Sequence, residues 1–555
     1  MNNLHIKKLT IKNFKKIQSE SFDFNKKVNI LVGDNDSGKT TILEALELVA
    51  NSSYRGKALS TSLLPELFNN EVVKNFLDGD KSEQTLPEIL IEIYLYDCPE
   101  YRGKNNSSNQ DEDGVFIRIC FDDELTSTYQ EFVNRAVSID SIPTEFYKIE
   151  WFSFAWESIK FLNRKIKGLL IDPTRLHPTY GKTQYLSNII NSSLTKEQQA
   201  LLNLNYRQLR NTFGQQAQIE QLNKNLDSTN QVTEQSLSII ADTSSGNVEA
   251  GLQLAVDDIS FSHIGKGEQN KIQIKLALLN KGGNVNFVMI EEPENHLSHT
   301  NLSELIKFIS DNNKNQVFIT THSSYVLNKL SLNNLCLLSQ KYLRLSDIDK
   351  KTSKTLQRLP GYDTLRIVLS KKVILVEGSS DELILKKIYL QKNNKLPEED
   401  GIDIIVVHGL GFKHYLNIAT HIKTQVHVVK DNDGSYKSNI ENYENKFKFD
   451  NDNIIFFSEK DDSLKSLEPS LIAANAKDIS SLDALAKISL SPKAYEKFNR
   501  ISDLDTKKAY FVSIYIGEKG DKNYGSKKVD SAIRIFDSKE TIKYPKYLLE
   551  ALKFD

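Results

Sequence analysis

The sequence predicts an α/β protein made of two α/β units, with a helical segment inserted into the first. Three observations predict it. A glycine-rich loop lies between an apolar strand and a helix at residues 33–40, polar residues at helical spacing interrupt the α/β pattern at 183–245, and a second series of apolar strands begins at Lys372. The 555 residues are too many for one hydrophobic core, so two to four domains are expected.

Composition bounds the class of protein. Hydrophobic residues make up 39% and charged residues 26%, which is ordinary for a globular chain, and the net charge of −2 neither indicates nor excludes a nucleic-acid partner. No run approaches the ~18 consecutive apolar residues that span a bilayer. Residues 1–8 contain no apolar export segment. Cys98, Cys120 and Cys336 lack metal-binding spacing, which argues against a zinc site or a disulfide framework, so we expect a reducing, cytoplasmic compartment. Because no apolar run is long enough to span a bilayer, no membrane partner is expected.

The loop at residues 33–40 has the composition of a phosphate-binding loop. Gly33 and Gly38 allow backbone conformations that point N–H groups at phosphates, and the following helix adds its N-terminal positive charge. Lys39 should reach the β- and γ-phosphates of ATP, and Thr40 should ligate Mg²⁺. The expected nucleotide ligands here are Gly33, Asn35, Gly38, Lys39, Thr40 and Thr41.

The rest of the first unit alternates apolar and polar residues at strand spacing before and after this loop. A polar loop is expected at 104–111. The predicted elements are two or three strands in 4–32, a helix at 41–49, strands at 89–95 and 115–121, and further strand-like runs in 145–171.

Residues 196–224 are polar and glutamine-rich, with Leu or Ile every three to four positions and no proline. This pattern predicts amphipathic helix. Because it interrupts an α/β pattern that resumes near residue 250, we interpret 183–245 as an inserted helical arm. The arm could serve self-association, and a simple packed helical subdomain is the alternative.

Three loops follow the arm. A glycine loop at 265–269 precedes a helix expected at Lys271–Leu279, a buried strand at 286–290 ends in Glu291 and Glu292, and a strand at 316–321 ends at His322. Two acidic residues after a strand would complete the magnesium site of a P-loop enzyme. Glu291 would hold Mg²⁺ directly or through water, and Glu292 would polarise the attacking water. His322 could sense the γ-phosphate, and a structural histidine is the alternative.

Together these segments resemble the ABC-type ATPase heads of the SMC and RecF group. The resemblance implies that the signature of one subunit closes over ATP bound by another, in a head-to-head dimer. It places Gly265, Gly267, Glu268 and His322 at the nucleotide. The nearest counterpart of the family's signature serine is Ser262, and no glutamine is assigned to the family's Q-loop.

A second α/β unit follows a charged, turn-rich connector expected at 346–370. A strand at 372–376 ends at Glu377, where open α/β sheets bind ligands. A helix over Leu383–Tyr389 is opened by Ser379–Glu382, in which Ser379 and Glu382 have capping-box spacing. Asp381 in this opening is a further expected metal ligand, and simple stabilisation of the helix start is its alternative.

Two more strands are predicted, at 402–407 and 425–430, and the second ends in Asp431-Asn432-Asp433. Side-chain alternation would point Asp431 and Asp433 the same way, beside Glu377 on a neighbouring strand. Carboxylates this close repel unless a divalent cation lies between them, so Mg²⁺ or Mn²⁺ is expected.

A Glu at one strand end and Asp-x-Asp about fifty residues later resemble the Toprim domain. An ABC-type head followed by Toprim resembles the OLD (overcoming lysogenization defect) family of nucleases, over nearly the whole chain. The resemblance implies a later acidic ligand, for which Glu468 fits, and a late catalytic lysine. Lys527 or Lys528 is preferred because Val529, Ala532, Ile533 and Ile535 form an apolar helix face. Lys519 and Lys522 are the alternatives for the catalytic lysine. Asp461 and Asp462 could be extra metal ligands, and an exposed acidic turn is the alternative for them.

The predicted domains are an ATPase domain in two parts, 1–182 and 246–345, separated by the arm at 183–245, then a linker at 346–370 and a Toprim nuclease domain at 371–555. The predicted function is an ATP-regulated DNA endonuclease that uses two divalent ions about 3.5–4 Å apart. Its expected catalytic residues are Glu292, Glu377, Asp431, Asp433, Lys527 and Lys528, and its expected metal ligands are Thr40, Glu291, Glu377, Asp381, Asp431, Asp433 and Glu468.

The resemblance further implies a homodimer or higher oligomer and a role in bacterial anti-phage defence, beside a helicase-like protein or a retron reverse transcriptase with its DNA. A nucleotide-gated DNA clamp or sensor with an inactive Toprim domain is the main alternative. A topoisomerase would need a tyrosine on a DNA-binding module, and a primase would need zinc-ribbon cysteines. Neither feature is recognisable in the sequence.

Overall fold

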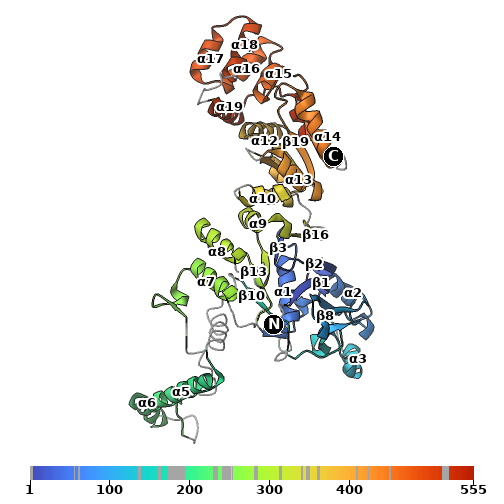
Figure 1. Ribbon diagram of the computed structural model, residues 1–555, viewed down its shortest axis with the longest axis vertical. Coiled ribbons are helices and arrows are strands. Elements are labelled where there is room, and N and C mark those ends of the chain that lie inside the picture. Colours follow the sequence, from blue (N-terminus) through green and yellow to red (C-terminus); the bar gives the residue numbers. More distant parts are fainter. Residues whose placement is uncertain are drawn as a thin grey trace. The chain divides into compact units, whose positions relative to one another are not determined.

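The computed structural model (Figure 1) forms two compact units, Met1–Ile30 with Gly38–Thr321 and Leu31–Ser37 with His322–Asp555. Among the described residues, no helix is both long and apolar enough to cross a membrane. The structure describes residues 4–54, 57–59, 63–135, 139–160, 164–172, 194–228, 236–240, 252, 254–279, 285–311, 315–338, 342–345, 350–358, 363–407, 411–422, 424–448, 452–515 and 524–554.

An antiparallel sheet in the first unit has the strand order β2-β1-β6-β8-β7, and β9 pairs with β8. The alternation of apolar and polar residues places one face of each strand in the core. Across β1 and β6, Leu9 pairs with Ile93 and Ile11 pairs with Ile91, and all four are buried. The strands are β1 (His5–Phe14), β2 (Ile17–Asp23), β6 (Ile89–Tyr96), β7 (Arg102–Gly103), β8 (Glu112–Phe121) and β9 (Tyr147–Ser153).

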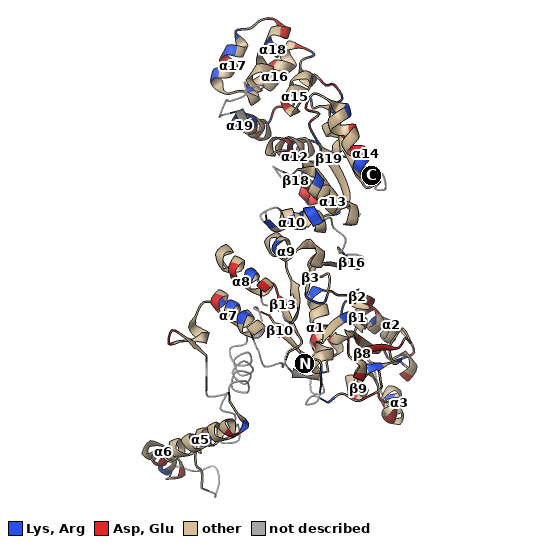
Figure 2. Cartoon of the chain, in the orientation of Figure 1, with Lys and Arg blue, Asp and Glu red and all other residues tan. Residues whose placement is uncertain are grey.

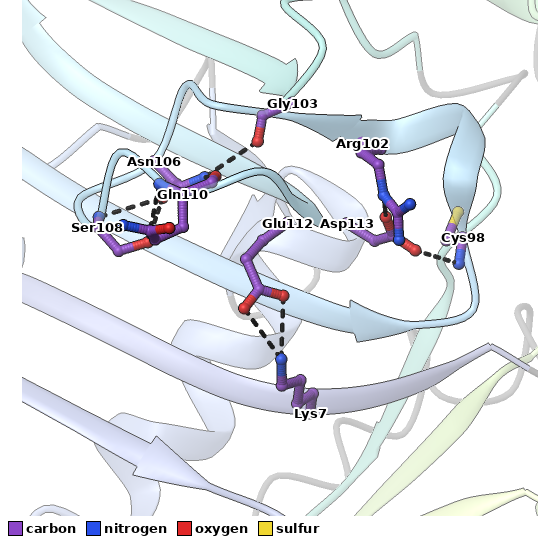
Figure 3. A network of polar contacts seen from close by, with 9 residues as sticks. All are labelled: Lys7, Cys98, Arg102, Gly103, Asn106, Ser108, Gln110, Glu112 and Asp113. Carbon is purple, nitrogen blue, oxygen red and sulfur yellow. Dashed lines mark hydrogen bonds and ion pairs between the residues drawn. The ribbon is translucent and has the colours of Figure 1, made fainter.

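The polar loop expected at 104–111 joins β7 to β8 and is held by a network of polar contacts (Figure 3). The Asn106 amide donates to the carbonyl oxygens of Gly103 and Gln110, at 3.2 and 2.8 Å. At the base of the hairpin, Asp113 accepts from Arg102 Nε at 2.7 Å. These bonds satisfy the buried polar groups that a loop leaves unpaired.

A second sheet has the order β10-β13-β14-β3-β15-β16. Its central strands are continuous apolar runs, as expected for strands covered on both faces. The strands are β3 (Val28–Gly33), β10 (Gly168–Ile171), β13 (Phe287–Glu291), β14 (Gln316–Thr320), β15 (Leu335–Leu338) and β16 (Tyr342–Arg344). The expected strands and their order along the chain are confirmed.

The helices of the first unit include α1 (Lys39–Asn51), which follows the glycine loop, and the arm helices α5 (Lys196–Gly214) and α6 (Ala217–Ser228). Thr195 and Gln198 form a capping box at the start of α5, and neither arm helix has a buried residue. The remaining elements are α2 (Asn70–Asp78), α3 (Thr126–Arg135), α7 (Lys266–Leu279), α8 (His299–Asp311), and the short strands β4 (Ser53–Tyr54), β5 (Lys57–Ala58), β11 (Ala255–Val256) and β12 (Ile259–Ser260).

The start of α7 corrects a prediction. The helix was expected from Lys271, but it begins at Lys266, so the glycine loop forms its first turn. Gln269 explains the difference, because its backbone N–H donates to Gly265 O at 3.0 Å and its side-chain amide donates to Phe261 O and Ile264 O. These bonds close the turn despite the low helix propensity of glycine.

The second unit contains a four-stranded parallel sheet with the order β18-β17-β19-β20. Ile374 and Leu385 belong to its core together with residues of the C-terminal helices. Its elements are β17 (Lys372–Val376), α12 (Ser379–Asn393), β18 (Ile402–Val406), α13 (Phe412–Ile422), β19 (Gln425–Val429), α14 (Asn442–Lys448), β20 (Ile454–Phe457), α15 (Leu467–Asn475), α16 (Ile479–Ser489), α17 (Pro492–Asn499), α18 (Leu504–Tyr515), α19 (Tyr524–Asp537) and α20 (Lys546–Ala551).

The segment expected as a turn-rich connector, 346–370, contains two helices, α10 (Lys350–Arg358) and α11 (Thr364–Leu369). Both helices have a buried apolar face, to which the fully buried Leu356 and Ile367 belong. The many charged residues between these positions made that pattern hard to recognise in the sequence. The preceding helix α9 (Ser324–Leu330) bonds to the start of α11. The described part of this segment is therefore packed structure rather than a chain of turns.

Candidate functional site

The two glycines of the phosphate-binding loop are required for different reasons. A Cβ on Gly33 would lie 2.4 Å from both the Leu338 carbonyl oxygen and Ser37 Oγ, so only glycine allows this close approach. Gly38 has φ of +93° and is the N-cap of α1. This left-handed conformation favours glycine and turns the chain into the helix.

Three expected ligands lie in the first turn of α1. Lys39 is buried, Thr40 is half-buried, and Thr41 lies on the buried side of the helix. The Thr40 hydroxyl donates to the carboxylate of Glu291, at the end of β13. A hydroxyl and a carboxylate in contact at the start of this helix are the oxygen ligands that Mg²⁺ prefers, so these residues fit the expected ion.

Glu292 follows with a left-handed backbone, φ +42°, which is uncommon outside glycine. Its N–H donates to Thr320 O at 3.0 Å and to Thr320 Oγ1 at 3.2 Å, which ties it to the end of β14. Its carboxylate accepts from the Asn295 side-chain amide at 2.8 Å. The sequence analysis did not single out Asn295. Its position three residues after Glu292 could have indicated a contact within one turn of the chain.

The remaining residues expected to contact the nucleotide are exposed or half-buried. Asn35, Gly265 and His322 are exposed, while Gly267 and Glu268 are half-buried. A Cβ on Gly267 would lie 2.2 Å from the His296 carbonyl oxygen, so this glycine lets α7 pack directly against the backbone after Glu292. Glu268 pairs with Lys271 in α7 at 2.8 Å, and Ser262 Oγ lies 2.8 Å from Ser260 Oγ.

A second acidic site lies at the carboxyl end of the parallel sheet in the second unit. Val376 and Val429 are partners on adjacent parallel strands, so Glu377 and Asp431 follow neighbouring strand ends. Burial raises the pKa of the Asp431 carboxyl, and the charges of Asp381 and Glu377 raise it further. Burial and the charge of Glu468 likewise raise the pKa of Asp381. These four carboxyl groups therefore lie near enough for their charges to interact.

Two lysines balance this acidic site. Lys528 Nζ, on α19, lies 2.7 Å from Glu468 Oε2, and its charge lowers the pKa of Asp381. Lys430 Nζ lies 3.4 Å from Glu377 Oε1 and 3.6 Å from Asp433 Oδ2. Of the two preferred late lysines, Lys528 thus lies at the acidic site, whereas Lys527 is exposed.

Asp433 corrects the alternation argument. Strand β19 ends at Val429, so Asp431 and Asp433 do not continue its alternation. Asp433 adopts φ of +50° and is exposed, while Asp431 is half-buried. The chain turns here because Asn432, which is buried, uses its side-chain amide to bond Glu459 O and Asp461 O.

The helix start after β17 also differs from expectation. The N-cap of α12 is Gly378, whose N–H donates to Asp381 Oδ2 at 3.1 Å, so the cap does not use Ser379 and Glu382. Glu382 instead pairs with Lys386 at 2.9 Å. Asp381 therefore both caps the helix and contributes to the acidic site.

Three minor expectations have different outcomes. Asp461 and Asp462 form an exposed turn, as the simpler interpretation had it, bonding Ser463 and the backbone N–H of Tyr436. On α19, Ala532 and Ile535 are buried but Ile533 is exposed, because it lies on the opposite side of the helix. Lys519 and Lys522 lie outside the described residues.

The donor chemistry of the second site fits a hard divalent cation, since its candidate ligands are carboxylates. Among the residues that the structure describes, however, no three His, Cys, Asp or Glu side chains are gathered closely enough to hold a metal as they stand. The ammonium groups of Lys430 and Lys528 contact the carboxylates instead. Along the chain, acidic and basic residues are interspersed over the elements of both units (Figure 2).

Residues 5–327 match the family model of an AAA ATPase domain, and residues 368–433 match the model described as "Overcoming lysogenization defect protein-like, TOPRIM domain". This chain belongs to the OLD family of ATPase–Toprim proteins. The expected α/β organisation, an ATPase domain followed by a Toprim domain, is thereby confirmed. An ATPase joined to an OLD-like Toprim domain is the organisation of an ATP-dependent nuclease family.

This OLD-family chain is also similar to curated proteins of other names. It is 41% identical over 100 residues to the DNA replication and repair protein RecF of Francisella tularensis subsp. mediasiatica, a match over 16% of this chain and 29% of that protein. The chain thus spans under a third of the curated relatives that it matches.

Two solved structures are also similar. An SMC head bound to the C-winged helix domain of ScpA has 15% identity and a TM-score of 0.35, over 62% of this chain and 98% of that chain. The recombination mediator protein RecF has 11% identity and a TM-score of 0.32, over 62% and 99%. The family assignment does not depend on either.

Proposed function

We propose that this protein is an ATP-regulated, divalent-metal-dependent DNA endonuclease. The observation that carries the proposal is the cluster of Glu377, Asp381, Asp431 and Glu468 with Lys528 at the end of the Toprim sheet, in a chain that also has a phosphate-binding loop. Perturbed pKa values, here those of Asp381 and Asp431, are concentrated at functional sites, and carboxylates are typical ligands of divalent cations.

Each side chain has a proposed role at this second site. Glu377, Asp381, Asp431 and Glu468 would hold one or two Mg²⁺ or Mn²⁺ ions, and Asp433 would join them by a rotation of its exposed side chain. Bound ions supply an activated water and stabilise the charge on the scissile phosphate. Lys528 would contribute positive charge to the transition state, because its ammonium already lies at the carboxylates.

At the first site, Lys39 would bind the β- and γ-phosphates of ATP, and Thr40 and Glu291 would hold Mg²⁺. Glu292 would orient the water that attacks the γ-phosphate. Gly265, Gly267, Glu268 and His322 would complete the site when two heads meet around ATP.

The proposed homodimer would also use the arm. Its helices carry apolar side chains that stay exposed, among them Leu209 and Phe213, with 66% and 63% of their surface accessible. Exposed apolar residues at helical spacing are typical of a surface that pairs with another helix. A second copy of the arm is the proposed occupant.

Plasmid cleavage in Mg²⁺ or Mn²⁺, with and without ATP, tests the nuclease. We expect cutting by the unaltered protein and a loss of at least a hundredfold in Asp431→Asn, because one carboxylate of the metal site is removed while the volume stays the same. Asp530→Asn, an exposed change on α19, should cut normally. Lys39→Ala shows whether nucleotide controls the cut.

Two results would contradict the proposal. Equal cutting by Asp431→Asn and the unaltered protein would indicate a contaminating nuclease. Failure of the unaltered protein on plasmid, linear, nicked and single-stranded DNA in every metal, while it still binds DNA in response to ATP, would favour a nucleotide-gated clamp or sensor.

We further propose that the nuclease acts in bacterial anti-phage defence, with a helicase-like protein or a retron reverse transcriptase as partner. This proposal rests on the family resemblance alone. Plaque counts on cells that carry the unaltered gene or Asp431→Asn test it, since defence by cleavage requires that only the unaltered protein lower the count.

A further inference from the structure

The segment that follows β13, Glu291–Leu297, is a strained turn. Glu292 and His296 both have left-handed backbones, with φ of +42° and +63°. Non-glycine residues hold this conformation only when their surroundings enforce it, and such positions are concentrated at functional sites. The contacts that enforce it here therefore bear on the carboxylate of Glu292.

The backbone of the turn is fixed from two directions. Glu292 N–H donates to Thr320, and Asn295 N–H donates to Glu292 O at 3.0 Å, which closes the turn on itself. On the far side, the His296 carbonyl lies against Gly267, where no side chain would fit. These contacts hold the main chain of Glu292.

The Asn295 side chain contacts the carboxylate of Glu292 directly. Its amide Nδ2 donates to Glu292 Oε2 at 2.8 Å, and both side chains are half-buried. An amide donor orients the carboxylate that accepts its hydrogen bond without adding a charge of its own. An aspartate at the same position would have the same shape but repel Glu292.

We propose that Asn295 is a positioning residue for ATP hydrolysis, which fixes the carboxylate of Glu292 in the orientation needed to align the attacking water. The inference rests on the proposed role of Glu292 in the ATPase. Asn295 acts only through Glu292, so its loss should lower the rate of hydrolysis without lowering the affinity for ATP.

The test compares Asn295→Ala and Asn295→Asp with Asn301→Asp, which makes the same charge change in α8. We expect kcat for ATP hydrolysis to fall about tenfold in Asn295→Ala, the effect of one hydrogen bond to a charged group, and further in Asn295→Asp. The dissociation constant of a fluorescent ATP analogue should change less than twofold in all three.

Several outcomes would overturn the inference. A kcat within twofold of the unaltered protein in both Asn295 variants would show that the hydrogen bond does not position Glu292. A loss of ATP affinity and of melting temperature in parallel with kcat, in Asn295→Ala as well, would assign Asn295 a purely structural role. If the unaltered protein hydrolyses no ATP, the proposed ATPase function fails first, whereas an active protein with unaffected variants overturns only the role of Asn295.

Discussion

At the scale of single residues, the carboxyl groups at the acidic site of the Toprim sheet change one another's pKa values. Asp381 and Asp431 have raised pKa values because loss of solvent and the charges of neighbouring carboxyls disfavour their ionised forms. Such groups bind protons in the folded state at pH values where the unfolded chain has released them. Their contribution to stability is therefore fully present below the ordinary aspartate pKa of about 4 and is lost as pH rises through the raised value.

This sign gives a prediction. In EDTA, the melting temperature of the unaltered protein should fall more between pH 5.5 and pH 8 than that of Asp431→Asn, which mimics the protonated form at all pH values. Added Mg²⁺ should raise the melting temperature more at pH 8 than at pH 5.5, because metal binding needs the ionised carboxylates. Parallel pH profiles for the two proteins in EDTA would contradict the proton-binding role of Asp431.

At the scale of elements, α5 is a helix whose stability depends on what covers it. Its capping box accounts for its start, but Leu201, Leu209 and Phe213 are all exposed. Most helical stability in proteins comes from packing of the apolar face, so we expect these side chains to be covered in the assembled protein.

The double variant Leu209→Glu/Phe213→Glu should therefore raise the dissociation constant of the homodimer at least tenfold, because it places charges in the apolar contact. Sedimentation velocity over a dilution series measures it. Asn211→Asp, an exposed change on the side of the same helix opposite Leu209 and Phe213, is the matched control. An unchanged sedimentation profile in the double variant would favour the alternative, a helical subdomain that takes no part in self-association.

At the scale of the whole molecule, the question is how ATP could control the second site. Helix α9 begins two residues after His322, and Ser324 Oγ donates to Asp363 Oδ1 at 2.6 Å at the start of α11. Arg366, in α11, donates to Asp403 Oδ1 at 2.8 Å on β18, next to the strand that ends at Glu377. These bonds link the segment after the expected sensor histidine to the Toprim sheet within one compact unit.

Arg366→Met should therefore reduce the effect of ATP on DNA cleavage more than it reduces ATP hydrolysis or cleavage itself. We expect ATP hydrolysis and metal-dependent cutting to stay within about threefold of normal, while the ratio of cleavage rates with and without ATP moves toward one. Arg358→Met, an exposed change at the end of α10, is the control. A normal ATP response in Arg366→Met would show that control follows another route.

The sequence by itself determined the order of the elements, the phosphate-binding loop, the acidic strand ends and the family. These are local features, since glycine conformation, strand alternation and residues placed after a strand are all written in consecutive positions. Sequence spacing also predicted that Glu377 and Asp431 follow neighbouring strand ends, because adjacent parallel strands end at one edge of a sheet.

Only the tertiary structure decided which distant side chains meet. Lys528 approaches Glu468 because α19 packs against the Toprim core, a contact that no local pattern contains. Asn295 acquired a role only when the turn folded its amide onto Glu292, and the buried face of α11 was hidden among charged residues. Long-range packing and turn geometry depend on the whole chain, which is why the start of α7, the exposure of Asp433 and the helices of the expected connector could not be read from the residues alone.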